Sequence, residues 1–167
     1  MDHASLNSDL DKRLSSVMDG RKNNKISGYI NDCHISAYYH MRLAWMLRSH
    51  YQFKICFILC DWALSELIRA LYAWEHNEFC AINGLSMLEQ LELLHTDSNS
   101  GLDIIIFRGT MQSLAELEEL PHIQSLKSSD VDKLLFNTED ILCRLSARIF
   151  ADSTKQYQRV RDMEKRY

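Results

Sequence analysis

Ionisable side chains interrupt one otherwise apolar stretch of the chain, residues 43–74. Asp61, Glu66 and Arg69 lie within it. Two carboxylates beside a guanidinium can act as an acid–base set or bind a charged ligand. Glu66 and Arg69 are three residues apart, however, which is also the ordinary spacing of an ion pair on a helix. The sequence is therefore compatible with two interpretations of these residues: a structural ion pair, or a functional pocket or buried interface.

The segment that must position these groups is predicted to be one helix over residues 51–76. At about 100° per residue, its polar side chains gather on one narrow stripe and apolar side chains cover the opposite side. The stripe consists of Lys54, Asp61, Ser65, Arg69, Tyr72 and His76. A wide apolar surface is typical of a helix that packs against two or three neighbours at once. We therefore expect this helix to be the centre of a bundle, with its polar stripe on the wet side.

Apolar residues recur at intervals of three and four along most of the chain, which predicts helices throughout. The fold class we predict is all-α, an up-and-down bundle of five or six helices with a long C-terminal helix. Residues 1–27 are expected to form an N-terminal helix and a polar linker, and residues 28–167 the bundle with a basic C-terminal helix extension. The predicted helices cover residues 5–18, 29–49, 51–76, 85–95, 102–120 and 130–167, with a polar break at 19–28.

The run at residues 102–107 is compatible with two structures. Its β-branched residues would suit a buried strand. A lone strand would have no partner elsewhere in the chain, so we assign residues 102–120 to a helix with a weak point at Gly109. Pro121 ends this helix, because proline removes a backbone donor and restricts the residue before it.

Composition and charge narrow the class of protein. The chain has 167 residues, 46% hydrophobic, which is enough for one core. The five cysteines form no CxxC pair, so we expect reduced thiols in a cytoplasmic protein and no metal or other cofactor. Cys56 and Cys60, one turn apart, are expected in the core. The most apolar window, 55–74, carries three ionisable groups that would be costly in a bilayer, so no membrane span is expected.

The net charge of −4 is unevenly distributed. Residues 141–167 hold seven basic and three acidic side chains, whereas residues 85–140 are strongly acidic. This balance argues against extensive nucleic-acid binding but is compatible with a local contact at the basic C-terminus. The candidate residues for that contact are Lys155, Arg159, Arg161, Lys165 and Arg166. A solvated helix end, favoured by its own macrodipole, is the other interpretation.

The sequence around the central helix resembles the HEPN family of helical domains. The residues that carry the resemblance are Leu43-Ala, then His50-Tyr51, then Asp61-Trp-Ala-Leu-Ser-Glu66-Leu-Ile-Arg69-Ala-Leu71. The resemblance covers about residues 29–150. It implies an all-helical domain. We expect a homodimer because the two wide apolar helices, residues 29–49 and 51–76, exceed what a small monomeric bundle needs.

Ribonuclease members of that family carry an Arg and a His on one late helix, which meet their copies across a dimer. A histidine can transfer protons there and a guanidinium can stabilise phosphate charge. At the matching position this chain has Arg108, but no histidine follows within seven residues. Arg69 and His76, seven apart on one helical face, are the pair that fits the spacing elsewhere. They are either a catalytic pair or part of a polar outer stripe.

These observations lead to one functional prediction and one alternative. We predict a non-catalytic interaction or regulatory module that is homodimeric and binds a protein partner or a nucleotide-like ligand. The binding candidates are Asp61, Glu66, Arg69 and Arg108. The alternative is a metal-independent, toxin-like ribonuclease that uses Arg69 and His76.

Overall fold

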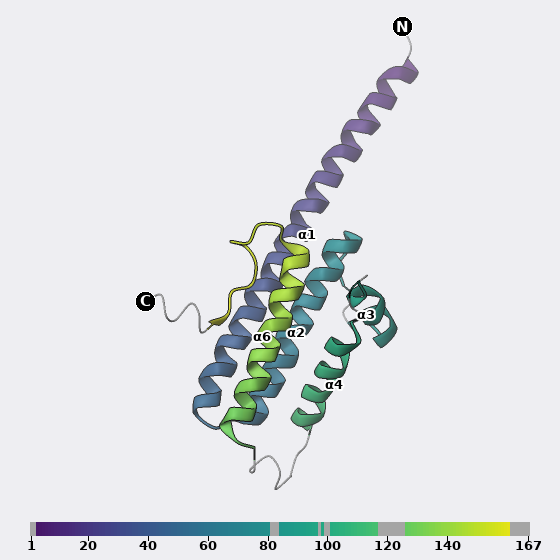
Figure 1. The fold of residues 1–167 in the computed structure, drawn as a ribbon. Coiled ribbons are helices and arrows are strands. Elements are labelled where there is room, and N and C mark those ends of the chain that lie inside the picture. The colour runs from purple at the N-terminus through teal and green to yellow at the C-terminus, as the bar shows by residue number, and fades with distance from the viewer. Residues whose placement is uncertain (1–2, 81–83, 97, 99–100, 117–125, 161–167) are drawn as a thin grey trace.

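The computed structural model describes residues 3–80, 84–96, 98, 101–116 and 126–160, with side chains from residue 22 onward. In this part of the chain five helices form an all-α, up-and-down bundle (Figure 1). They are α1 (His3–Ser49), α2 (Phe53–His76), α3 (Met87–Leu94), α4 (Leu102–Glu116) and α6 (Ser128–Ile149). The predicted fold class is confirmed. The β-branched run at 102–107 is helical, as predicted.

Helix α2 is the centre of the bundle. α1, α3, α4 and α6 all contact it, and twelve of its 24 residues are buried. Cys56 and Cys60 are among them, and both are free thiols packed in the core. A single helix can contact so many neighbours because apolar side chains cover most of its circumference. The prediction of a continuous central helix is therefore confirmed.

Helix α1 has no break at residues 19–28, so the predicted linker after the first short helix is wrong. The helix is continuous from His3 to Ser49. The segment contains no proline. Its two glycines, Gly20 and Gly28, each cost a helix about 1 kcal/mol, and its Lys and Asn side chains cost less, so packing can offset them. Packing also favours continuity: Ile26 is buried, and Asn77 at the end of α2 donates a hydrogen bond to the Asn23 side chain at 3.2 Å.

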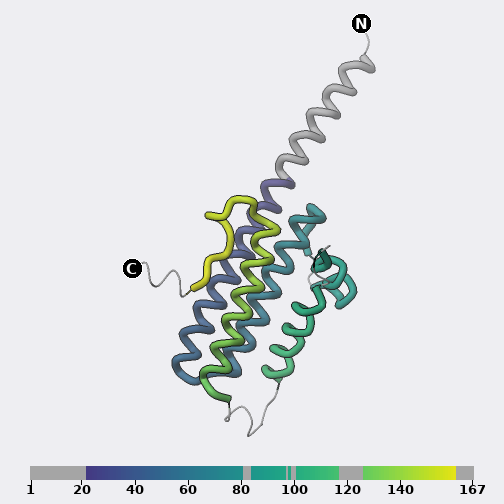
Figure 2. The backbone as a smooth tube through the Cα atoms, in the orientation of Figure 1, coloured from purple at the N-terminus to yellow at the C-terminus, as the bar shows by residue number. Residues whose placement is uncertain are grey.

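The predicted helix from residue 130 towards 167 is wrong over residues 150–159. α6 ends at Ile149, and residues 150–159 turn back along the bundle without forming a helix (Figure 2). The fully buried Glu139 explains the turn, because its Oε1 accepts hydrogen bonds from the Val160 N–H at 2.8 Å and the Tyr157 hydroxyl at 3.3 Å. Burying Tyr157 and Val160 stabilises the fold more than extending α6 by a further, solvent-exposed turn would. Residues 161–167 lie outside the described part of the chain.

A glycine fixes the connection between α3 and α4. Gly101 has φ +73°, and a Cβ atom there would lie 2.5 Å from the Leu94 Cβ. Only glycine combines that backbone conformation with so close an approach. It lets α4 begin directly beside α3, which positions the side chains of α4 against α2. α4 is described to Glu116; the predicted end at residue 120 lies outside the described residues.

Gly109, in contrast, is a replaceable weak point of α4. It is exposed in the interior of the helix, and an added Cβ would meet no atom within 4 Å. We expect Gly109→Ala to raise the free energy of unfolding by about 1 kcal/mol, because alanine loses less backbone entropy in a helix. Urea denaturation followed by circular dichroism measures this. A destabilised variant would mean that Gly109 has an undetected packing role.

Candidate functional site

Arg108 of α4 joins three helices through hydrogen bonds. Its Nε donates to Asp61 Oδ1 at 2.7 Å, its Nη2 to Ser65 Oγ at 2.8 Å, and its Nη1 to Gln90 Oε1 at 2.8 Å. Asp61 and Ser65 are one turn apart on α2, so both face the same guanidinium. The Arg108 and Asp61 side chains are only 17% and 15% exposed. This part of the predicted wet stripe is therefore turned inward against α4.

Asp61 and Arg108 have a structural role, because their ion pair holds α4 against α2. All three guanidinium nitrogens of Arg108 already donate to protein acceptors, and Gln112 Nε2 also donates to Asp61 Oδ1 at 3.1 Å. A half-buried guanidinium whose charge is neutralised has little capacity left for an external anion. The sequence placed Asp61 and Arg108 among the binding candidates, and the structure brings them together as partners of each other.

Glu66 and Arg69 form the ion pair that their spacing predicts, at 3.5 Å. Glu66 also lies beside the buried Cys33, where burial and then hydrogen bonding to Glu66 raise the pKa of the thiol to about 12. Arg69 lines a small cavity of about 210 Å³ that Arg108 also borders. Arg69 and Arg108 thus share a cavity, although each already has an acidic partner.

His76 is placed differently from Arg69. It lies exposed at the end of α2, with its ring 4.4 Å from the ring of Tyr72. The two residues share a helical face, as their spacing requires, but contact different neighbours.

Two members of the basic C-terminal group lie in the described chain. Arg159 forms an ion pair with Asp140 of α6. Lys155 is exposed and borders two surface hollows. The remaining candidates, Arg161, Lys165 and Arg166, lie outside the described residues.

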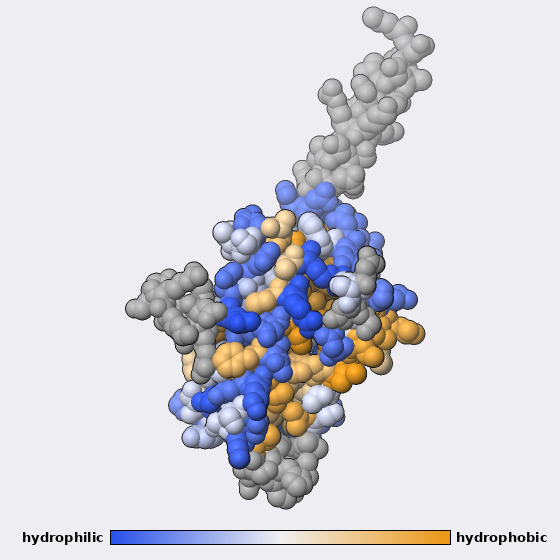
Figure 3. Space-filling model, viewed as in Figure 1, coloured by the Kyte–Doolittle hydropathy of each residue, from blue (hydrophilic) through white to orange (hydrophobic). Residues whose placement is uncertain are grey.

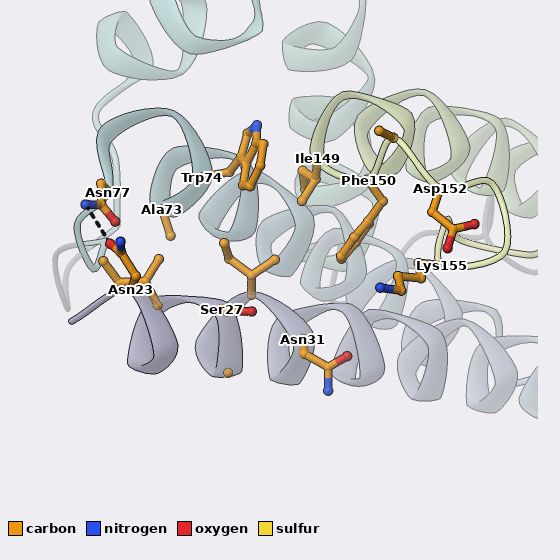
Figure 4. Close-up of a pocket in the computed structure, with 14 residues that line it drawn as sticks. Asn23, Ser27, Asn31, Ala73, Trp74, Asn77, Ile149, Phe150, Asp152 and Lys155 are labelled. Atoms are coloured by element: carbon orange, nitrogen blue, oxygen red, sulfur yellow. Dashed lines mark hydrogen bonds between the residues drawn. The ribbon is translucent and has the colours of Figure 1, made fainter. Parts of the chain in front are cut away.

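The largest hollow that we describe is a groove at one end of the bundle, which the sequence analysis did not predict. It has a volume of about 710 Å³ and lies between α1, the C-terminal end of α2 and the turn that follows α6 (Figure 4). Its walls are mostly apolar and include Ile26, Ala73, Trp74, Ile149 and Phe150. Residues from three distant segments build it, so no local motif signals it.

The rim of the groove carries amides and one charge of each sign. Asn23 and Asn77 face each other across one end and share a hydrogen bond (Figure 4). Asn31 lies further along α1, and Asp152 and Lys155 lie on the turn after α6. Asp152 caps its own turn by accepting hydrogen bonds from Thr154. The described residues of the rim thus have no net charge and include several groups that can both donate and accept hydrogen bonds.

Apolar side chains are also exposed on the outer face of α1. Ile35 is 45% exposed, Tyr39 61% and Met46 54%. Their intervals of four and seven residues place them on one stripe. The opposite face of this helix, with Ile30, Ala37 and Ala44, is buried. A second group of exposed apolar side chains lies over α3 and α4, including Leu88 and Ile106 (Figure 3).

Comparisons with protein-family models, with curated proteins and with solved structures find no match for this chain. Among the helices of the described chain, none has the length and apolar character needed to cross a bilayer. The described residues also contain no group of three or more His, Cys, Asp or Glu side chains arranged to hold a metal ion.

Proposed function

We propose that this chain is a non-catalytic helical interaction module, similar to HEPN domains, that forms a homodimer and binds a protein partner in the groove between α1, α2 and the turn after α6. The observation that carries the proposal is the groove itself, which combines apolar walls with an uncharged rim of amides. Concave, mostly apolar surfaces with a few polar groups are where proteins bind ligands and partner segments. An apolar side chain of the partner would fill the groove.

The chemistry of the rim favours a peptide segment over a nucleotide-like ligand. Phosphate groups are held by several free cationic or N–H donors. Among the described residues that line the groove, Lys155 is the one cation, and Asp152 lies on the same turn. Asn23, Asn31 and Asn77, in contrast, can pair with the N–H and C=O groups of a peptide backbone. A neutral segment with an apolar anchor fits these walls best.

The ribonuclease alternative receives less support from the geometry. Arg69 is paired with Glu66, and His76 packs on Tyr72 near the end of the helix. To cut RNA, the two side chains would have to leave these partners and meet in a cleft between two copies. Cleavage of RNA by the purified chain that disappears in Arg69→Ala and His76→Ala would establish that alternative and refute the non-catalytic module.

Filling the groove tests the proposal directly. Ser27 is exposed and borders the groove, whereas Asn24 is exposed on the same helix outside it. We expect peptides selected on the wild-type chain from a random library to carry a large apolar residue. Ser27→Trp should weaken their binding about tenfold or more, a loss of about 1.4 kcal/mol, because the indole occupies the groove. Asn24→Trp should leave their affinity unchanged.

Two results would contradict the proposal. One is that the selected peptides bind Ser27→Trp as tightly as the wild type, which would place their site elsewhere. The other is a saturable change in tryptophan fluorescence when AMP is titrated that is absent from Trp74→Phe, because Trp74 lines the groove. That result would favour the nucleotide-like ligand over the protein segment.

A further inference from the structure

The outer face of α1 carries six exposed residues whose positions along the chain are symmetric about Ala37. They are all of the exposed residues between positions 28 and 46 that lie within a sector of about 80° of the helix surface. They are Gly28, Asp32, Ile35, Tyr39, Arg42 and Met46. We call this set the α1 stripe. It is opposite the buried face, which is centred on Ala37.

The residues of the α1 stripe form three pairs equidistant from Ala37 along the chain. Ile35 and Tyr39 lie two residues on either side, Asp32 and Arg42 five, and Gly28 and Met46 nine. Two copies of α1 packed antiparallel about a two-fold axis at this level would bring the members of each pair together. The pairs are complementary: an apolar side chain against an aromatic ring, an acid against a base, and glycine against a long side chain.

We propose that two copies of the chain associate through their α1 stripes, antiparallel, with the two-fold axis level with Ala37. Asp32 of one protomer then pairs with Arg42 of the partner subunit, twice in each dimer. Ile35 and Tyr39 pack at the centre. This inference rests on the homodimer of the proposed function and assigns the surface and register that form it.

The charged residues and the open space of the α1 stripe are available to a second copy of the chain. Within the described part of the chain, neither Asp32 nor Arg42 forms a salt bridge or a side-chain hydrogen bond, and both are exposed. A Cβ added to Gly28 would meet nothing within 4 Å, so Met46 of the partner subunit has room there. An isologous interface requires that positions equidistant from the two-fold axis be complementary in charge, apolar character and size, whereas an unrelated partner would not require it.

Charge reversal tests both the interface and its register. Asp32→Arg would place two arginines together at each of the two symmetric contacts, and Arg42→Asp would place two aspartates together. The double variant Asp32→Arg/Arg42→Asp restores opposite charges. Only an antiparallel arrangement that pairs these two positions predicts this pattern. Because both positions are exposed, the variants are expected to fold, which circular dichroism checks.

Sedimentation velocity of the full chain over a micromolar concentration range is the measurement. We expect a wild-type dimer, a dissociation constant raised about tenfold or more in each single variant, and recovery to near the wild-type value in the double variant. Lys133→Asp, a reversal at a 76% exposed side chain on α6, is the control and should have no effect.

Each other outcome overturns a defined part of the inference. A wild-type dimer that is insensitive to the single reversals, or that the double reversal fails to restore, excludes this register. A wild-type monomer over the whole range excludes the interface and the homodimer together. Neither result refutes partner binding in the groove, because the peptide assay with Ser27→Trp tests that separately. Gly28 also lines the groove, so the two surfaces adjoin there.

Discussion

We expect Arg108→Ala to lower the free energy of unfolding by about 3 kcal/mol. The substitution removes the side chain that holds α4 to Asp61 and Ser65 of α2 and to Gln90 of α3. The largest cost comes from Asp61, which is only 15% exposed and would lose its cationic partner. Removing one member of a largely buried ion pair leaves an uncompensated charge, which costs more than the lost attraction itself.

A surface ion pair provides the matched control for Arg108. Arg144 contacts Asp103 at 3.0 Å, with both side chains about half exposed. Arg144→Ala should lower the free energy of unfolding by less than about 1 kcal/mol, because water already solvates both groups. Urea denaturation of both variants under identical conditions gives the comparison. Equal effects of the two substitutions would mean that the Arg108 cluster does not stabilise the junction of α2, α3 and α4.

We expect Glu139→Ala to lower the free energy of unfolding by about 3 kcal/mol as well. The carboxylate is fully buried in α6 and accepts hydrogen bonds from the Val160 N–H and the Tyr157 hydroxyl. Alanine would leave both buried donors without this acceptor, each at a cost of about 1–3 kcal/mol. Residues 150–160 should then detach first, so limited proteolysis should cut the variant in this segment. Unchanged stability and protease resistance would show that apolar packing alone holds the segment.

The glutamine variant isolates the contribution of the charge at position 139. Burial raises the pKa of Glu139, although hydrogen bonds, beginning with that from the Val160 N–H, oppose the shift. A raised pKa in the folded state means that folding favours the protonated carboxyl. Its contribution to stability is therefore complete below the unfolded-state pKa, about 4.5, and is lost as the pH rises through the folded-state value.

Glutamine does not titrate, so the pH dependence of the two proteins should differ. We expect the stability of Glu139→Gln, relative to the wild type, to increase as the pH rises above about 4.5. Subtracting the two pH profiles cancels His34, whose pKa burial lowers in both proteins. A difference that stays constant from pH 4 to 8 would contradict a raised pKa for Glu139.

The central helix could be predicted because its signal is local. Apolar residues surround α2 over six turns, and no tertiary contact is needed to recognise that pattern. The direction in which its polar stripe faces depends on tertiary structure. Asp61 and Ser65 resemble a solvated edge until Arg108, distant in sequence, is placed against them. The family resemblance likewise directed attention to Arg108 and Arg69 but could not reveal that acidic partners hold both.

The secondary structure of residues 19–28 and 150–159 was predicted less well. In both segments the local preference of the sequence and the tertiary packing act in opposite directions and are of similar size. The polar residues 19–28 resemble a linker, but nothing in them forbids a helix, and packing of Ile26 and Asn23 extends α1 through them. Residues 150–159 retain helix-compatible composition, yet burial of Tyr157 and Val160 against Glu139 turns the chain away from α6. In both cases a few long-range contacts decide the outcome.

The groove could not be predicted from the sequence at all, since its lining comes from residues near 23–31, 73–77 and 149–155. Small and apolar residues at those positions have an ordinary interpretation as core. The exposed face of α1 could have been recognised, because Ile35, Tyr39 and Met46 repeat at helical intervals opposite the buried face. It was not recognised, because the wider, buried apolar face of the same helix dominates the sequence pattern.

Binding in the groove is the central claim, and chemical-shift mapping by NMR tests it most directly. The isotope-labelled chain would be titrated with a peptide selected for an apolar anchor. We predict saturable shifts confined to the groove, at the amides of Asn23, Ala73, Ile149 and Lys155. Shifts centred on Arg69 and Arg108, or no saturable shift at any position, would contradict the claim.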